Sequence, residues 1–206
     1  MMTSTENIDP KRQAILNAAT QLFLTYNYRC VSMDKIAQTA PVSKATLYNH
    51  FSSKEELLVA VVQGICVSIV QTVAQTLSTN DDIKSNLRKI ASALVDVIYS
   101  TGGLAIHRLL VAESHEFPEL GQMVHDNGMK PTLEQLANYL QQLNDGGHFS
   151  IPNSDFAADV FFGLLEGKLH FRCLLGLRPP PDEDEKKQLI ESAITFFLKG
   201  IGYEEC

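Results

Sequence analysis

The alternation of apolar and polar positions over residues 31–54 predicts two very short helices and the start of a third. Ser32 can cap a helix that buries Ile36, and Val31, just before the cap, can pack on Ile36 as a hydrophobic staple. Pro41 should end this helix, because proline lacks a backbone donor and clashes with the preceding turn.

The same pattern returns directly after the turn. Val42 and Leu47 flank Ser43, which can cap a second helix of about two turns. Leu47 and Phe51 lie four residues apart and should both face inward. Two short helices joined by a tight turn predict a helix-turn-helix motif over residues 32–51.

The outward face of the second helix combines hydrogen-bonding side chains with one fixed positive charge. Its residues are Ser43, Lys44, Thr46, Tyr48, Asn49 and His50. A helix N-terminus with a serine and a lysine can hold a phosphate, and an asparagine can form two hydrogen bonds with an adenine edge. An ordinary solvated helix face has the same composition, and composition alone favours the two interpretations about equally.

Three segments carry a family resemblance: V-S-M-D-K-I-A, V-S-K-A-T-L-Y-N-H-F and S-K-E-E-L. With helix lengths and spacing in register over about the first 65 residues, they resemble the N-terminal DNA-binding domain of the TetR/AcrR family of bacterial transcription regulators. In that family the second short helix enters the major groove. The resemblance implies DNA contacts by Ser32, Ser43, Lys44, Ala45 through its backbone, Thr46, Tyr48, Asn49, His50 and Lys54.

The resemblance also implies a division of roles among these contacts. Thr46 and Asn49 are expected to contact base edges. Contacts with phosphates are expected from Lys44, Tyr48, His50 and Lys54. One residue departs from the family pattern, because Pro41 stands where the turn usually has a glycine with a positive φ. Proline is fixed near −65°, so we expect a locally different turn with the motif otherwise intact.

Apolar residues recur at helical spacing through the rest of the chain, and no strand pattern is present. A helix should start at Asp9 and Pro10, and a long helix should start at a capping box of Ser53 and Glu56 and lead out of the motif as a lever. Glycines after position 100 and at Gly128 should end helices. Further helices are predicted over residues 83–98, 104–116, 118–127, 131–145, 155–175 and 185–201.

These elements predict an all-α protein of about nine to ten helices in two domains. Residues 9–65 form a three-helix helix-turn-helix head, and residues 66–206 form a larger helical-bundle body for ligand binding and dimerisation. The body segments R-L-L-V-A-E-S-H-E-F-P-E-L and A-A-D-V-F-F-G-L-L-E-G resemble the C-terminal domain of an AefR-like subgroup.

The last two predicted helices, at about 155–175 and 185–201, are apolar on more than one face. Such helices must be buried on more than one side. They predict a homodimer interface in which two copies form a four-helix bundle, and the resemblance implies the same. An internal core is the alternative.

Composition limits the class of protein further. With 206 residues, 45% of them hydrophobic, the chain can bury a sizeable core. The four cysteines have no C-x-x-C spacing, no signal peptide is recognisable, and no unbroken apolar run approaches the ~18 residues of a membrane span. We therefore expect a cytoplasmic protein without membrane insertion.

The net charge of −7 is unevenly distributed. Residues 1–60 hold six basic and five acidic side chains, giving +1, so the remainder holds −8. An acidic body with a near-neutral head fits a protein that meets double-stranded DNA with one end.

Polar residues set among apolar ones in the body could line a cavity for an unknown small-molecule effector. Core packing, or simple pairing of Glu166 with His170 four residues later, explains each of them singly. The candidate ligand contacts are Tyr99, His107, Glu113, Phe117, Met123, Phe162, Glu166 and His170.

Enzymatic activity is not expected. The chain has no H-E-x-x-H spacing, no nucleophile motif and no glycine-rich phosphate loop, so we predict no cofactor and no metal site. The function predicted is a ligand-responsive transcriptional repressor that binds a palindromic operator as a homodimer. The alternative is a helical small-molecule-binding protein without operator function, which would not need the face formed by Lys44, Tyr48 and His50.

Overall fold

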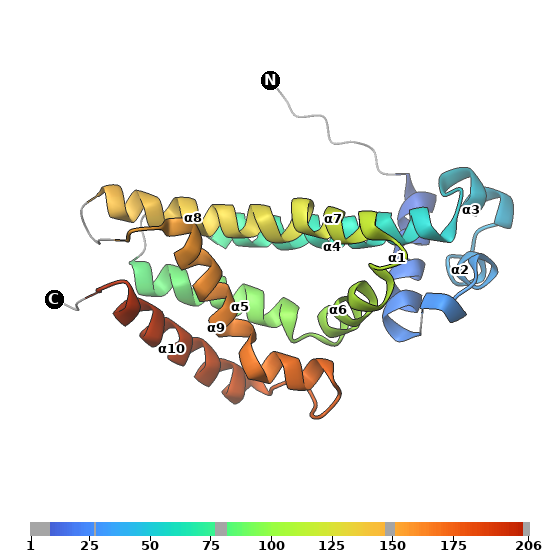
Figure 1. Ribbon diagram of the computed structural model, residues 1–206. Coiled ribbons are helices and arrows are strands. Elements are labelled where there is room, and N and C mark those ends of the chain that lie inside the picture. Colours follow the sequence, from blue (N-terminus) through green and yellow to red (C-terminus); the bar gives the residue numbers. More distant parts are fainter. Residues whose placement is uncertain (1–8, 27, 77–81, 147–150, 204–206) are drawn as a thin grey trace, which may run out of the picture.

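The computed structural model describes residues 9–203, except residue 27 and residues 77–81 and 147–150. Within these residues the chain is helical and contains no strand, which confirms the all-α prediction (Figure 1). The α-helices are α1 (Pro10–Thr25), α2 (Met33–Thr39), α3 (Lys44–His50), α4 (Lys54–Thr76), α5 (Ile83–Ile98), α6 (Thr101–Glu113), α7 (Pro118–Val124), α8 (Lys130–Asp145), α9 (Ser154–Leu174) and α10 (Glu183–Gly200).

The helices α1, α2 and α3 and the start of α4 form the head, which lies at one end of the molecule in Figure 1. Its core contains Phe23 of α1, Ile36 of α2 and Leu47 of α3, each at most 3% exposed. The same hydrophobic cluster extends into α6 through Leu109 and into α7 through Leu120. The head is therefore packed onto the body by shared apolar residues.

The helices α5, α8, α9 and α10 enclose a second hydrophobic cluster, which is the core of the body. Its buried side chains include Leu94, Leu140 and Phe161. The 23-residue helix α4 joins the two cores, because Leu57 belongs to the head cluster and Val73 to the body cluster. In Figure 1 α4 runs beside α8 along the molecule, so it is placed to act as the predicted lever.

By length and composition alone, the α4 segment Lys54–Gln75 could cross a membrane. We expected no such segment because no unbroken apolar run approaches ~18 residues, but mean hydropathy over the helix is high enough despite its polar breaks. Leu57, Leu58 and Val61 of this helix are buried in the head cluster, so its apolar residues take part in the fold.

Helix α5 ends at Ile98 as predicted, but the predicted start of the next helix and the predicted helix end at Gly128 are wrong. The glycines after position 100 lie in the first turn of α6, because Ser100 caps that helix and its Oγ accepts a hydrogen bond from the backbone N–H of Gly103 at 2.8 Å. Gly128 lies within a π-helical turn, His125–Met129, that connects α7 to α8. A Cβ at Gly128 would lie 2.9 Å from Sγ of Cys66, so this glycine permits a close approach to α4.

Candidate nucleic-acid interface

The two short helices of the motif are capped as their sequence predicts. Ser32 Oγ accepts a hydrogen bond from the backbone N–H of Lys35 at 3.2 Å, and Ser43 Oγ accepts one from that of Thr46 at 3.0 Å. Leu47 is completely buried. These local interactions fix α3 with one face against the head core and the opposite face outward.

The turn between α2 and α3 corrects our expectation for Pro41, which has a φ of 23°. The backbone N–H of Val42 donates to the carbonyl of Ala37 at 3.1 Å, which is the longer hydrogen bond of a Schellman motif. That motif requires a left-handed residue where Pro41 stands. The turn therefore keeps the glycine-like geometry, and the proline is strained and cannot donate the second hydrogen bond.

The outward face of α3 presents polar side chains to solvent. Tyr48 is 50% exposed and Asn49 is also exposed. Within the part of the chain that the structure describes, neither of these two side chains has a hydrogen-bond partner. Lys44 Nζ lies 2.6 Å from an Oδ of Asp34, and both side chains are more than half exposed. An exposed pair of this kind is weak, so Lys44 can exchange Asp34 for a phosphate.

Three further predicted contacts lie on or beside this helix. Thr46 Oγ1 lies 2.8 Å from Ser43 Oγ, and His50 Nε2 lies 3.4 Å from an Oδ of Asp9. Ala45 is exposed, as a backbone contact requires. The structure thus brings the predicted residues of α3 together on one surface.

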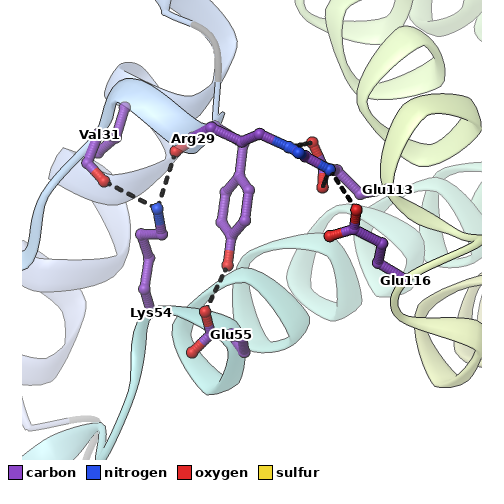
Figure 2. A network of polar contacts seen from close by, with 7 residues as sticks. Arg29, Val31, Lys54, Glu55, Glu113 and Glu116 are labelled. Carbon is purple, nitrogen blue, oxygen red and sulfur yellow. Dashed lines mark hydrogen bonds and ion pairs between the residues drawn. The ribbon is translucent and has the colours of Figure 1, made fainter.

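Lys54 is more constrained than the sequence suggests. Its Nζ donates to the backbone carbonyls of Tyr28 and Val31 at 3.1 Å each and lies 4.2 Å from the centre of the Tyr28 ring (Figure 2). The Tyr28 hydroxyl donates to Glu55, and burial raises the pKa of this phenol. Lys54 therefore ties α4 to the segment before α2.

One cation near this surface was missed by sequence reasoning. Lys11 lines a hollow of about 340 Å³ together with Pro41, Ser43 and Thr46. It belongs to the first turn of α1, far from the motif in sequence, so no local pattern pointed to it. A basic residue here adds positive charge beside the N-terminus of α3.

A polar junction links the head to the body. Arg29, in the short 3₁₀ helix Tyr28–Cys30, contacts Glu113 of α6 with Nε to Oε1 at 3.3 Å and contacts Glu116 with Nη2 to Oε1 at 2.7 Å (Figure 2). The Glu113 side chain is only 5% exposed, whereas Arg29 is 59% exposed. A buried carboxylate of the body is thus neutralised by a cation of the head.

The predicted ligand contacts fall into two groups rather than one. Glu113, Phe117 and Met123 lie at the junction, in or against the head cluster. The others belong to the body around α5, α6 and α9, and they are Tyr99, His107, Phe162, Glu166 and His170. A hollow of about 240 Å³ on α8 and α9, bounded by residues such as Met129 and Asp159, contains none of the eight.

The capped pair of short helices, with its polar face directed outward from one end of an all-helical molecule, defines a helix-turn-helix DNA-binding protein. Two family models match the chain. Residues 15–61 match the bacterial regulatory proteins of the tetR family, and residues 85–201 match the C-terminal domain of AefR-like transcriptional repressors. The chain belongs to the TetR family, as its motifs predicted.

Individual relatives agree with this assignment. The chain is 28% identical to the uncharacterised HTH-type transcriptional regulator YvkB of Bacillus subtilis over 93% of its own length and 97% of YvkB. It is 42% identical to the HTH-type transcriptional activator FasR of Mycolicibacterium smegmatis, but over only 44% of its own length and 41% of FasR.

Solved structures extend the likeness to the whole fold. A TetR-family transcriptional regulator from Mesorhizobium loti matches with a TM-score of 0.86 and 26% identity, covering 93% of this chain and 96% of the other. The flavonoid-responsive regulator FrrA matches with a TM-score of 0.70 and 30% identity, and the match covers 92% of this chain and 96% of FrrA. The chain is therefore a transcriptional regulator with a DNA-binding helix-turn-helix, and not an enzyme.

Proposed function

We propose that the protein is a ligand-responsive repressor that binds a palindromic operator as a homodimer in the cytoplasm. The observation that carries the proposal is the outward face of α3, where Lys44, Tyr48 and Asn49 are exposed together at one end of the molecule. Asn49 is suited to a base edge and Lys44 to a phosphate. The repressor role follows the AefR-like repressors that the body resembles, although the relative FasR is an activator by name.

Homodimer formation is supported by exposed apolar side chains on the last two helices and their connection. Of the ten large hydrophobic residues exposed in the described part of the chain, five lie there. They are Phe156, Phe171, Leu175, Leu177 and Phe196, and each is at least 57% exposed. A second copy would cover them and would place two recognition helices for successive major grooves about 34 Å apart.

The dimer has a direct test. Phe196→Glu should yield a monomer in sedimentation experiments, because the charge would enter the interface, while the monomer should keep its fold because Phe196 is 67% exposed. Val111→Glu is the matched control, since Val111 is 70% exposed on α6. Unchanged association of the Phe196 variant would show that α10 is not the interface.

A response to ligand requires a path from the body to the head. The lever α4, the Arg29–Glu113 contact and the apolar cluster that the head shares with α6 and α7 all connect the two parts. A ligand that binds the two arrangements of the dimer with different affinity would shift the distance between the recognition helices. FrrA, a structural neighbour, is described as flavonoid-responsive, which supports a small-molecule effector for this chain too.

The head movement can be measured through Cys30, which is exposed in the head, whereas Cys66 and Cys173 are buried. A variant that keeps Cys30 as its sole cysteine would carry a spin label, and the distance between labels in the dimer would be recorded with and without an effector that releases DNA. Equal distances in both states would exclude this mechanism.

The first experiment is selection of a random DNA duplex library on the purified protein at near-physiological salt. An enriched palindrome with half-sites about one helical turn apart is the expected result. Lys44→Ala should abolish the enrichment, and Lys130→Ala, an exposed lysine of α8, should not. If nothing is enriched, or if the Lys44 variant selects the same sequences, the alternative of a small-molecule-binding protein without operator function is favoured.

A further inference from the structure

A group of potential metal ligands lies in the body, formed by His107 of α6 and by Glu166 and His170 of α9. One ligand atom from each residue lies within 4.8 Å of the other two. The imidazole rings of His107 and His170 have their centres 5.1 Å apart, and His170 Nδ1 lies 3.6 Å from Glu166 Oε1. The three side chains therefore converge on one point between two helices.

The backbone around this point is held in a special conformation. Helix α9 is kinked at Gly167, which has φ 47° and ψ −155°. The hydroxyl of Tyr99 donates to the carbonyls of Leu165 and Glu166, each at 2.9 Å, so that it satisfies acceptors at the kink. A Cβ at Gly167 would meet nothing within 4 Å, which means that the glycine is required for its φ and not for space.

The three side chains of the group are sheltered from solvent to different degrees. His170 is 4% exposed, and burial together with neighbouring His107 lowers the pKa of its imidazole to about 4. Burial also lowers the pKa of His107 and raises that of Glu166. Among the described residues no lysine or arginine pairs with Glu166. The partly buried carboxyl group thus lies beside two imidazole rings, and an imidazole nitrogen that carries no proton offers a lone pair to a metal ion.

We propose that His107, Glu166 and His170 bind one divalent transition-metal ion of the Zn²⁺ type, with a further coordination position open. Two imidazole nitrogens and one carboxylate are a ligand set that zinc uses, whereas Mg²⁺ and Ca²⁺ prefer oxygen ligands alone. Zinc–nitrogen bonds of about 2.0–2.1 Å require the ligand atoms to approach each other, which side-chain rotation can provide.

The site is not visible as a sequence motif because its ligands come from two separate helices. Our prediction of no metal site rested on the lack of a local spacing such as H-E-x-x-H. The site also does not depend on the proposed operator binding, because metal affinity is measured on the protein without DNA.

Metal binding would be measured on the full-length protein after removal of metal with a chelator. Titration with Co²⁺, followed by its visible absorption, should show one ion per chain, and Zn²⁺ should displace it. Zn²⁺ should also raise the melting temperature, because it binds the folded state. Glu166→Gln and His170→Ala should each weaken binding by about 100-fold or more, since even residues that only support a metal ligand contribute about 10–100-fold.

The matched control is His115→Ala, which removes an exposed histidine and should leave metal affinity unchanged. Glu166→Gln keeps the shape of the side chain, so its helix content and melting temperature without metal should match those of the parent protein. Equal Co²⁺ affinity in the parent and in the Glu166 and His170 variants would overturn the proposal. So would a thiolate charge-transfer band, which would place the metal on a cysteine.

Discussion

The head and the body use polar residues in opposite ways. On α3 of the head, Tyr48 and Asn49 are exposed and have no hydrogen-bond partner in the described part of the chain. In the body, His170 and Glu113 are at most 4% exposed and lie against other polar groups. A surface that meets a large polymer must stay open, whereas buried polar groups can respond only to something small or to a movement of their neighbours.

The distribution of charge follows the same division. Residues 1–60 carry +1 and the rest of the chain carries −8. The acidic remainder repels the phosphate backbone, so the molecule is oriented with its head toward DNA. A net charge of −7 therefore does not argue against DNA binding, because the excess of acidic groups lies in the body and not in the head.

The largest expected effect comes from the apolar support of α3. Leu47→Ala should lower the free energy of unfolding by about 2–5 kcal/mol, because the side chain is completely buried and a cavity would remain. Leu94→Ala in the body core, where Leu94 is 4% exposed, is the matched variant and should lose a similar amount. Denaturant unfolding would measure both changes.

DNA affinity separates these two variants. Under conditions in which both proteins are folded, DNA affinity should fall for Leu47→Ala and stay near the parent value for Leu94→Ala. Leu47, unlike Leu94, packs the recognition helix α3 against the head core. Equal affinities would mean that the head does not depend on this packing.

Two tyrosines sharpen the contrast between a buried and an exposed hydroxyl. Tyr99→Phe should lower the free energy of unfolding by about 1–3 kcal/mol, because the carbonyls of Leu165 and Glu166 would lose their donor at the kink. Tyr48→Phe should leave stability unchanged and weaken DNA binding. Thermal unfolding would measure stability, and DNA titration would measure affinity. If Tyr99→Phe were as stable as the parent protein, the kink would not need the hydroxyl.

Much of the head could be predicted from sequence because its determinants are local. The caps Ser32 and Ser43 act within three residues, and the buried position Leu47 follows from helical spacing. Family resemblance then supplied the function that the local pattern left open. The structure adds that Lys54 is bound to backbone carbonyls, which no spacing could show.

The polar groups of the body could not be assigned in the same way, because their partners lie on other helices. The sequence left Glu166 and His170 either as ligand contacts or as a simple pair and gave His107 as a separate candidate, and only the folded chain brings the three side chains together. Glu113 was predicted to contact a ligand, and the structure pairs it with Arg29 of the head instead of an open cavity. Whether a ligand reaches it stays a prediction.

Pro41→Gly should raise the free energy of unfolding by about 1 kcal/mol. Strained backbone conformations cost about 1–3 kcal/mol, and glycine relieves the strain at φ 23°, although its greater freedom in the unfolded chain offsets part of the gain. Denaturant unfolding would measure the change, with Pro118→Gly at the start of α7 as the control for losing a proline. A large gain in DNA affinity would instead mean that the proline disturbs the recognition helix of the parent protein.

The smallest expected effect concerns the acidic residue that pairs with Lys44 of the recognition helix. Asp34→Asn removes the carboxylate that lies 2.6 Å from Lys44 Nζ, and an exposed pair contributes about 1 kcal/mol at most to stability. DNA affinity should rise a few-fold at low salt and less at high salt, because Lys44 is released and a repulsive charge is lost. Glu134→Gln breaks a similar exposed pair with Lys130 in the body and should change nothing. Weaker DNA binding in the Asp34 variant would show that Asp34 positions Lys44 rather than competing for it.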